Sequence, residues 1–265
     1  MSELLSFTGE RLHSENVLFG VDLVRHRAAY AYAIDRARAL GARRVMEIGS
    51  GTGYGTAELA EAGLEVFALD RVTPDPVARH PQVGFVRADA FSIPVRADVF
   101  DLVVSFQVIE HLADPNPYLA SIAHMTRPGG EAIITTPNLT QSDRENPFHL
   151  REYTAEELAE LLSAHFEEVE MLGVGATPAP MAYYDERLKR IRRIVRLDPL
   201  GLRKVPPRGL IDRLFAMFAV VVRRGIQQGS GLPDVTLDDF PIEPAHDRSL
   251  DLLAVRRRPR TGASR

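Results

Sequence analysis

Four glycines at alternate positions follow an acidic residue in the segment 45–56, VMEIGSGTGYGT. Glycine allows tight turns and lets a ligand approach the backbone closely, and a helix that begins in such a loop directs its first N–H groups at the ligand. The spacing therefore predicts a loop that holds a small molecule, with Glu47 beside it. The four glycines are Gly49, Gly51, Gly53 and Gly55.

A second acid, Asp70, ends the next apolar segment, 23 residues after Glu47, which is near the spacing at which a carboxylate meets ribose hydroxyls. A dinucleotide fingerprint, G-x-G-x-x-G, would need glycine at position 54 or 56, depending on the register. The chain has Tyr54 and Thr56 there, so the fingerprint fails in both registers. The loop and Asp70 therefore fit a cofactor that carries a ribose, and the dinucleotide class is the less favoured one.

Residues suited to proton transfer follow later segments. Glu110 and His111 come just after the apolar segment 99–107. His149 lies in the segment 146–158, NPFHLREYTAEEL, whose first part is expected to be a loop. Histidine is the natural base at neutral pH. We therefore expect one of these side chains to act as a base that takes a proton from the reacting group of a substrate. The alternative is structural: Glu110 and His111 are a structural pair, and His149 anchors its loop.

The surrounding pattern alternates apolar strands with helices, which predicts a parallel sheet covered on both faces. Ligands bind such a sheet at the carboxyl ends of its strands, where the glycine loop and the candidate bases fall. Thr154 and Glu157 have the spacing of a capping box at the start of one helix. The expected strands are 43–49, 64–70, 83–89, 99–107, 131–137, 166–175 and 249–258, and the expected helices are 22–40, 56–63, 116–126 and 154–165.

Several segments of the chain, in the order in which they occur, resemble the motifs of class I S-adenosylmethionine-dependent methyltransferases. The resemblance covers about residues 8–175 and the last strand. The resemblance implies an α/β fold: a Rossmann-like class I methyltransferase sheet with helices on both faces and a helical insertion before the last strand. The segments are E-x-G-x-G-x-G from Glu47, the acid Asp70, RADAF (87–91), FDLVVSFQVIEHL (100–112), and RPGG (127–130) before EAIITTPN.

In this family S-adenosyl-L-methionine is the cofactor and S-adenosyl-L-homocysteine is the product. The resemblance implies that Asp70 binds both ribose hydroxyls and that Asp89 contacts the adenine amine. It also implies that Gln107 lies beside the methionine moiety, while Glu47 orients the amino acid end, directly or through water. The residues expected to bind the cofactor are Glu47, Gly49, Gly51, Gly53, Tyr54, Asp70, Arg71, Asp89, Ala90, Phe91 and Gln107.

The candidates for catalysis are His111, His149 and Glu110. Because the sulfonium is already activated, alignment and desolvation can supply much of the rate, and a base helps a hydroxyl acceptor. Some members of the family carry E-x-x-E-H at a metal site, but Gln107 stands here where the first Glu would be. We therefore expect no metal.

Three segments resemble a bacterial subgroup associated with glycan or cell-surface polysaccharide assembly: TGER (8–11), GTGYGT (51–56) and NPFHLREYT (146–154). That subgroup has an Arg–Tyr pair in the helix before the first strand, whereas this chain has Ala29 before Tyr30. We expect methyl transfer to a hydroxyl of a small molecule or glycan, with nitrogen as the second choice. The alternatives are an NAD-dependent oxidoreductase or epimerase and a non-catalytic S-adenosylmethionine-binding partner subunit.

The alternation of strands and helices breaks before the last strand. We expect 1–175 and 246–258 to form the methyltransferase domain, 176–245 to form a helical insertion, and 259–265 to form a flexible tail. Within the insertion, 187–224 carries twelve Arg or Lys against two Asp. This segment could be a lid, a homodimer contact, or a contact to a membrane or to a lipid-linked or phosphorylated acceptor, and a lid or dimer is favoured. Aromatic residues are not interleaved with the basic ones, so no nucleic acid partner is expected.

The composition excludes several other classes. Of 265 residues, 45% are apolar and 26% are charged, as in an ordinary globular protein, and the net charge of −4 is mild. Because there is no cysteine, disulfides and thiol chemistry are excluded. We find no secretory signal at the start and no apolar run of about 18 residues, so we expect a cytoplasmic protein.

Overall fold

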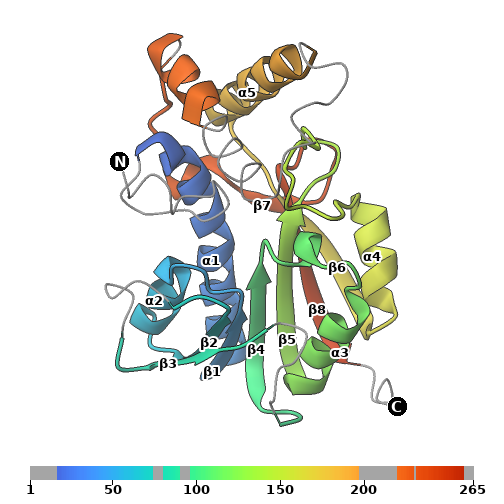
Figure 1. Ribbon diagram of the computed structural model, residues 1–265. Helices are drawn as coiled ribbons and strands as arrows, with labels where there is room; N and C mark the ends of the chain where they lie inside the picture. Colours follow the sequence, from blue (N-terminus) through green and yellow to red (C-terminus); the bar gives the residue numbers. More distant parts are fainter. Residues whose placement is uncertain (1–16, 74–79, 90–95, 197–219, 230, 260–265) are drawn as a thin grey trace.

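The computed structural model describes residues 17–73, 80–89, 96–196, 220–229 and 231–259, and these form an eight-stranded sheet with helices on both faces (Figure 1). The order of the strands is β3-β2-β1-β4-β5-β8-β6-β7, which confirms the Rossmann-like α/β fold. The strands are β1 (Arg44–Ile48), β2 (Glu65–Asp70), β3 (Val83–Arg87), β4 (Phe100–Phe106), β5 (Thr126–Pro137), β6 (Phe166–Val174), β7 (Ile242–Pro244) and β8 (Asp251–Pro259).

The sheet is parallel only in part. Strands β3, β2, β1, β4 and β5 pair in parallel, as expected. The expectation of a wholly parallel sheet is wrong for β8, which is antiparallel to both β5 and β6, and for β7, which is antiparallel to β6. The reason is the insertion: the chain leaves β6 at the carboxyl edge and begins β8 at the same edge, with Asp251 opposite Val174, so β8 must run back across the sheet.

Two apolar cores lie on the two faces of the sheet because side chains alternate along each strand. In β4, Leu102 and Val104 belong to the core beneath α1 and α2, whereas Val103 belongs to the core beneath α3 and α4. All three side chains are buried, which explains why the strands are almost continuously apolar. The helices are α1 (Gly20–Leu40), α2 (Tyr54–Glu61), α3 (Asn116–Met125) and α4 (Ala155–Ser163).

The capping box predicted at the start of α4 is confirmed. The Glu157 N–H donates to Thr154 Oγ1 (3.2 Å), and the Thr154 N–H donates to Glu157 Oε2 (3.0 Å). These two bonds satisfy N–H groups that a helix leaves without partners in its first turn. They also fix the point at which the loop after β5 ends.

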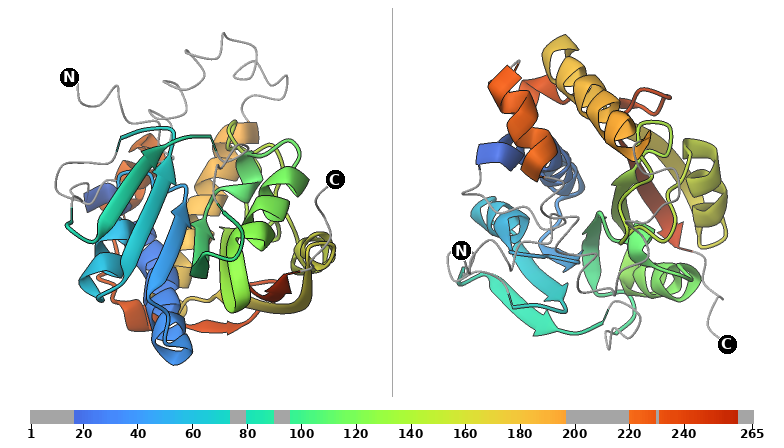
Figure 2. Two further views of the ribbon diagram at one scale, coloured as in Figure 1. Left: turned by 90° about the horizontal axis from the view of Figure 1, so that it is seen from below. Right: turned by 45° about the horizontal axis from the view of Figure 1, so that its top comes forward.

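The segment between β6 and β8 packs on the first half of α1. It contains α5 (Pro178–Arg196), the helical residues 220–229, the 3-10 turn η6 (Leu237–Asp239) and β7. Its buried side chains share an apolar core with α1, and Figure 2 shows α5 and residues 220–229 beside the start of that helix. The strand β7 is an addition to the helical insertion that we expected. Residues of this core include Val21, Ala28, Tyr184, Ile191, Val222 and Ile226.

Several expectations concern residues outside the described ranges. They are the TGER segment, the cofactor candidates Ala90 and Phe91, the middle of the basic segment (197–219), and the tail from residue 260. Within the described ranges, no helix combines the length and the apolar character that crossing a bilayer requires.

Candidate active site

The candidate residues follow strands whose carboxyl ends lie at one edge of the sheet. The loops after β1, β4 and β5 all leave the sheet at this edge, where parallel sheets bind ligands. Because β8 is antiparallel, its first residue, Asp251, lies at the same edge, opposite Pro137 of β5. The start of α1 and the helix α5 lie beyond this edge, so helices cover it (Figure 1).

The glycine loop has a backbone that other residues rarely adopt. Gly49, Gly51 and Gly53 have φ values of +83°, +56° and +89°, which lie in the left-handed region that favours glycine. A Cβ on Gly49 would also fall 2.3 Å from Cγ2 of Val108, in the turn after β4. The loop therefore passes close to that turn and leads directly into α2, which begins at Tyr54.

Glu47 is held by two hydroxyl groups. It is 1% exposed, its Oε1 accepts from the Tyr30 hydroxyl (2.7 Å), and its Oε2 accepts from the Thr56 hydroxyl. Burial raises the pKa of Glu47 to about 7, although the two hydroxyl groups act in the opposite direction. A Cβ on Gly55 would lie 1.9 Å from Tyr30 Cζ, so this glycine leaves room for the tyrosine ring. Sequence reasoning missed the roles of Tyr30 and Thr56 because nothing local in the sequence links them to Glu47.

Asp70 joins the glycine loop to the end of β2. Its Oδ2 accepts from the Gly51 N–H (2.8 Å) and its Oδ1 accepts from the Val72 N–H (2.9 Å). One carboxylate can accept about four hydrogen bonds, so holding the loop is compatible with accepting from a ribose diol. Arg71 and Asp89 are exposed near the same end of the sheet, where the Ala88 N–H donates to the Asp70 carbonyl (3.1 Å). This chemistry fits a cofactor with a ribose.

Gln107 turns the chain at the end of β4. Its φ is +57°, which is uncommon for a residue other than glycine and marks positions of functional interest. Its N–H donates to the Thr135 carbonyl (3.0 Å), and its Nε2 lies 3.4 Å from Thr135 Oγ1. The turn directs the following residues, Glu110 and His111, across the carboxyl edge.

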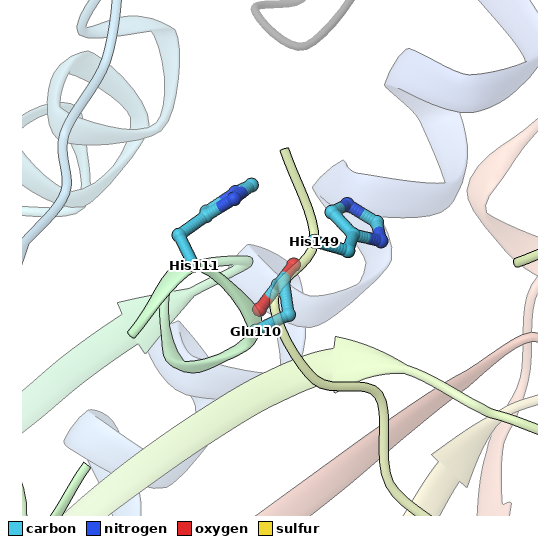
Figure 3. Close-up of side chains that lie close together, drawn as sticks. All are labelled: Glu110, His111 and His149. Atoms are coloured by element: carbon cyan, nitrogen blue, oxygen red, sulfur yellow. The ribbon is translucent and has the colours of Figure 1, made fainter. Parts of the chain in front are cut away.

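Glu110, His111 and His149 converge from two loops, and we call them the His/Glu cluster (Figure 3). A ligand atom of each lies within 4.8 Å of those of the other two, and the two imidazole centroids are 5.2 Å apart. The loops are joined by their backbones, since the N–H groups of Leu150 and Arg151 donate to the Glu110 carbonyl at 2.8 and 3.2 Å. The structure thus brings together all three residues predicted for catalysis.

The partners of the two histidines indicate where their protons lie. His111 Nδ1 is 3.0 Å from the Phe148 carbonyl oxygen, and His149 Nδ1 is 2.7 Å from Glu152 Oε1. Both oxygens only accept, so each Nδ1 carries a proton and a neutral ring has its lone pair on Nε2. His149 Nε2 lies 2.7 Å from Asn146 Nδ2, which can donate to it. His149 is therefore held on both sides by its own loop.

Glu110 is the buried acid of the cluster. It is fully buried, and Oε2 accepts from the Thr136 hydroxyl (3.1 Å), whereas buried Oε1 has no hydrogen-bond partner among the described residues. Burial raises the pKa of Glu110 to about 7, with the nearby His149 acting against that rise. Near neutral pH, Glu110 can therefore either hold or accept a proton.

A cavity of about 190 Å³ lies beside the cluster. Its sheet side is made by the His/Glu cluster, Gln107 and the loop after β5, and its helical side is made by α1, α5 and residues 220–229. His26 of α1 also lines it and lies 3.3 Å from the Tyr54 hydroxyl. Burial, and then Arg25, lowers the pKa of His26 to about 3, so this ring is neutral. A lid was one expected role of the insertion, but the residues of α1, α5 and 220–229 that line the cavity were not identified from the sequence, because only the packing of these helices brings them together.

The chain is similar to known proteins along most of its length. Residues 24–169 match the family model of the methyltransferase domain. A probable S-adenosylmethionine-dependent methyltransferase of Mycolicibacterium smegmatis is 34% identical over 278 residues, covering 96% of this chain and 96% of the relative. A probable S-adenosylmethionine-dependent methyltransferase of Mycobacterium tuberculosis is 32% identical over 274 residues, covering 97% of this chain and 90% of the relative.

The fold has solved counterparts of the same class. A methyltransferase structure from Thermotoga maritima, described as a possible histamine N-methyltransferase, has a TM-score of 0.53 and 18% identity, covering 90% of this chain and 91% of that chain. The family model and the two relatives thus define the class as a methyltransferase, built on a Rossmann-like fold. The chain belongs to the S-adenosylmethionine-dependent methyltransferases, with S-adenosylmethionine as cofactor. The oxidoreductase alternative is not favoured by these comparisons.

Proposed function

We propose that this enzyme transfers the methyl group to a hydroxyl of a small molecule or of a glycan. The observation that supports this acceptor is the His/Glu cluster, which lines the cavity together with Gln107. Gln107 precedes Val108, whose side chain packs against Gly49 of the glycine loop. When bound, the cofactor supplies a methyl group on an activated sulfonium. The remaining tasks of the protein are to align the hydroxyl and to take its proton.

We assign the role of base to His111. Its Nδ1 proton is committed to the Phe148 carbonyl, so the lone pair of the neutral ring is on Nε2. His149 has partners on both ring nitrogens and is better suited to fixing the loop beside the acceptor. Glu110, whose pKa is near 7, can take up the proton or stabilise a charged imidazole. An amine acceptor remains the second choice, because an uncharged amine needs no base to begin the reaction.

For the cofactor, we propose that Asp70 accepts from the ribose hydroxyls and Asp89 from the adenine amine. Gln107 would lie beside the methionine moiety, and the backbone N–H groups of the glycine loop would face the amino acid end. Glu47, which is bonded to Tyr30 and Thr56, would act by fixing this loop and α2.

The base assignment is tested by methyl transfer from radiolabelled S-adenosylmethionine to a panel of sugars, nucleotide sugars and sugar phosphates. We expect His111→Gln to lower kcat by about 10²–10⁴-fold, the usual contribution of acid–base catalysis. The matched control is His124→Gln, since His124 is an exposed histidine of α3 away from the cavity. Binding of S-adenosylhomocysteine should be unchanged in both variants.

Other outcomes would change the assignment. If only His149→Gln lowers kcat, His149 is the base; if neither variant changes it by about tenfold, no histidine acts as base and an amine acceptor is favoured. The same assay is run after treatment with a chelator, because the ligand atoms of the His/Glu cluster are close enough to hold a metal. We expect turnover to be unchanged. Loss of activity that added Mg²⁺ or Zn²⁺ restores would contradict the metal-free mechanism.

A further inference from the structure

Three arginines line the helical side of the cavity, and we call them the arginine cluster: Arg25 of α1, Arg187 of α5 and Arg223 of the helical residues 220–229. We propose that this cluster binds an oxyanion of the acceptor, a carboxylate or a phosphate, and so sets the class of molecule that is methylated. The inference rests on the proposed function, because it places the acceptor in the same cavity as the His/Glu cluster.

Asp22 organises the arginine cluster. Arg223 donates to its Oδ2 from Nε (3.2 Å) and Nη2 (2.7 Å), and Arg187 Nη1 donates to its Oδ1 (3.1 Å). Although burial raises the pKa of Asp22, the three arginines outweigh that effect and hold this pKa well below its usual range. Asp22 is therefore ionised, and it positions two guanidinium groups that come from elements far apart in the sequence.

Two carboxylates are bonded to the arginine cluster. Arg25 donates from Nη1 to Asp251 (3.0 Å), which is the second of them after Asp22. Asp143, on the other side of the cavity, attracts Arg187 but forms no salt bridge with it within the described chain. The other acids that line the cavity are Glu110, Glu145 and Glu152, and they lie on its sheet side. The helical side is therefore the one that presents guanidinium groups to an acceptor.

Two members of the cluster have donors suited to a ligand. Arg187 makes one hydrogen bond to the described residues, through Nη1, and its side chain is 25% exposed. Arg25 has a buried Nε with no hydrogen-bond partner among those residues. Both guanidinium groups lie over the Tyr184 ring, at 5.4 Å for Arg25 and 6.0 Å for Arg187, which restricts their orientation. A guanidinium fork of fixed orientation matches the paired oxygens of a carboxylate or phosphate.

The two sides of the cavity therefore have complementary tasks. The arginine cluster would hold the anionic end of the acceptor, and the His/Glu cluster would meet its hydroxyl. Arg187 and Arg25 are the expected direct ligands, whereas Arg223 is a positioning residue that acts through Asp22. Two other arginines of α5 differ from the cluster: Arg192 and Arg193 are exposed and do not line the cavity.

The binding test uses isothermal titration of inorganic phosphate and of acetate into the full chain loaded with S-adenosylhomocysteine. We expect at least one of these anions to bind, and Arg187→Gln to weaken that binding by about tenfold or more, as expected when a hydrogen bond to a charged group is lost. Arg192→Gln is the matched control on the same helix and should bind like wild type. Arg187→Lys keeps the charge without the fork and should give an intermediate affinity.

The activity test compares glucose, glucuronate and glucose 6-phosphate as acceptors. An anionic acceptor should have a KM about tenfold or more below that of glucose, and Arg187→Gln should raise this KM about 10- to 100-fold with little change in kcat, because Arg187 lies away from the reacting hydroxyl. Unchanged affinity for S-adenosylhomocysteine shows that the variant is folded. The acceptor that responds distinguishes carboxylate from phosphate.

The two proposals fail in different ways. If neither anion binds, or if Arg187→Gln and Arg192→Gln bind anions equally, the arginine cluster is only an ionic link among three helices and the inference is overturned. If anion binding depends on Arg187 but no hydroxyl is methylated, the oxyanion site stands and the proposed hydroxyl acceptor is wrong.

Discussion

Glu47 and Glu110 are two buried carboxyl groups with different surroundings. Burial raises the pKa of each to about 7. Both oxygens of Glu47 accept from hydroxyl groups of the protein, whereas Oε1 of Glu110 has no hydrogen-bond partner among the described residues. Glu47 is thus suited to holding structure, and Glu110 is suited to exchanging a proton with a ligand. Residue type alone, acid next to a strand end, does not distinguish these roles.

The raised pKa of Glu47 predicts how stability depends on pH. Below about pH 4.5 the group is protonated in both states, so it has no effect on the free energy of unfolding. Between about pH 4.5 and 7 the unfolded chain loses this proton while the folded chain keeps it, so stability falls as pH rises. A glutamine side chain cannot ionise, so Glu47→Gln removes this fall in the free energy of unfolding, which is on the order of 3 kcal/mol.

Urea unfolding at pH 5 and pH 7.5 measures this effect. We expect the free energy of unfolding to fall less between the two pH values in Glu47→Gln than in wild type, even though the amide weakens the bonds from Tyr30 and Thr56. The control is Glu65→Gln, since Glu65 is half-exposed on β2 and pairs with Arg44 at the surface. Equal falls in Glu47→Gln and wild type would show that Glu47 does not hold its proton in the folded state.

At the scale of elements, the contact between α1 and α2 depends on one missing side chain. A Cβ on Gly55 would fall 1.9 Å from Tyr30 Cζ, and this backbone does not otherwise require glycine. Gly55→Ala must therefore displace Tyr30 and weaken its hydrogen bond to Glu47. We expect a loss of about 1–3 kcal/mol in the free energy of unfolding, as for other overpacked cores, and a lower affinity for S-adenosylhomocysteine because the glycine loop moves.

Thermal unfolding and ligand titration check this prediction. Gly20→Ala is the matched control, because Gly20 begins α1 and a Cβ there would meet nothing within 4 Å. We expect Gly20→Ala to melt at or slightly above the wild-type temperature, since alanine is favoured over glycine in a helix. If Gly55→Ala melts like Gly20→Ala, the two helices have room for a methyl group at residue 55 and Tyr30 does not require a glycine there.

Local patterns predicted the elements well, and tertiary contacts explain what they missed. Strands such as β4 and the capping box of α4 could be predicted because their signals lie within a few neighbouring residues. The direction of β8 depends on where the insertion returns the chain, which no local pattern encodes. In the same way, His149 could be placed near Glu110 from loop order, but the meeting of Arg25, Arg187 and Arg223 required the packing of three helices.

At the scale of the whole molecule, the site joins parts that are separate in the sequence. The glycine loop follows β1, Asp70 ends β2, and the covering helices come from the start of the chain and from the insertion. A ligand that contacts several of these parts stabilises the folded state by an amount that grows with the logarithm of its concentration relative to its dissociation constant, because the unfolded chain does not bind it. Thermal stability is therefore a measure of binding that does not depend on knowing the acceptor.

We expect S-adenosylhomocysteine at 100 times its dissociation constant to stabilise the protein by about 2.7 kcal/mol, which corresponds to a rise in Tm of roughly 5–10 °C. NAD should give no rise. Asp70→Ala should abolish the rise, because the proposed ribose acceptor is lost. Since Asp70 also accepts from the Gly51 and Val72 N–H groups, this variant will melt lower without ligand, and each shift must be measured from the variant's own baseline.

Glu65→Ala provides the control for Asp70→Ala, because it removes an acid from the other end of the same strand. If Glu65→Ala keeps the full rise in Tm with S-adenosylhomocysteine, the loss of that rise in Asp70→Ala comes from the missing carboxylate at the carboxyl edge and not from a weakened β2. If Asp70→Ala keeps the whole shift, the carboxylate serves only to tie the glycine loop to β2, and the ribose must be held elsewhere. If Asp70→Ala loses the shift and Asp70→Asn recovers part of it, a neutral acceptor at this position can still hold the loop and the diol, and the charge of Asp70 supplies the remaining affinity.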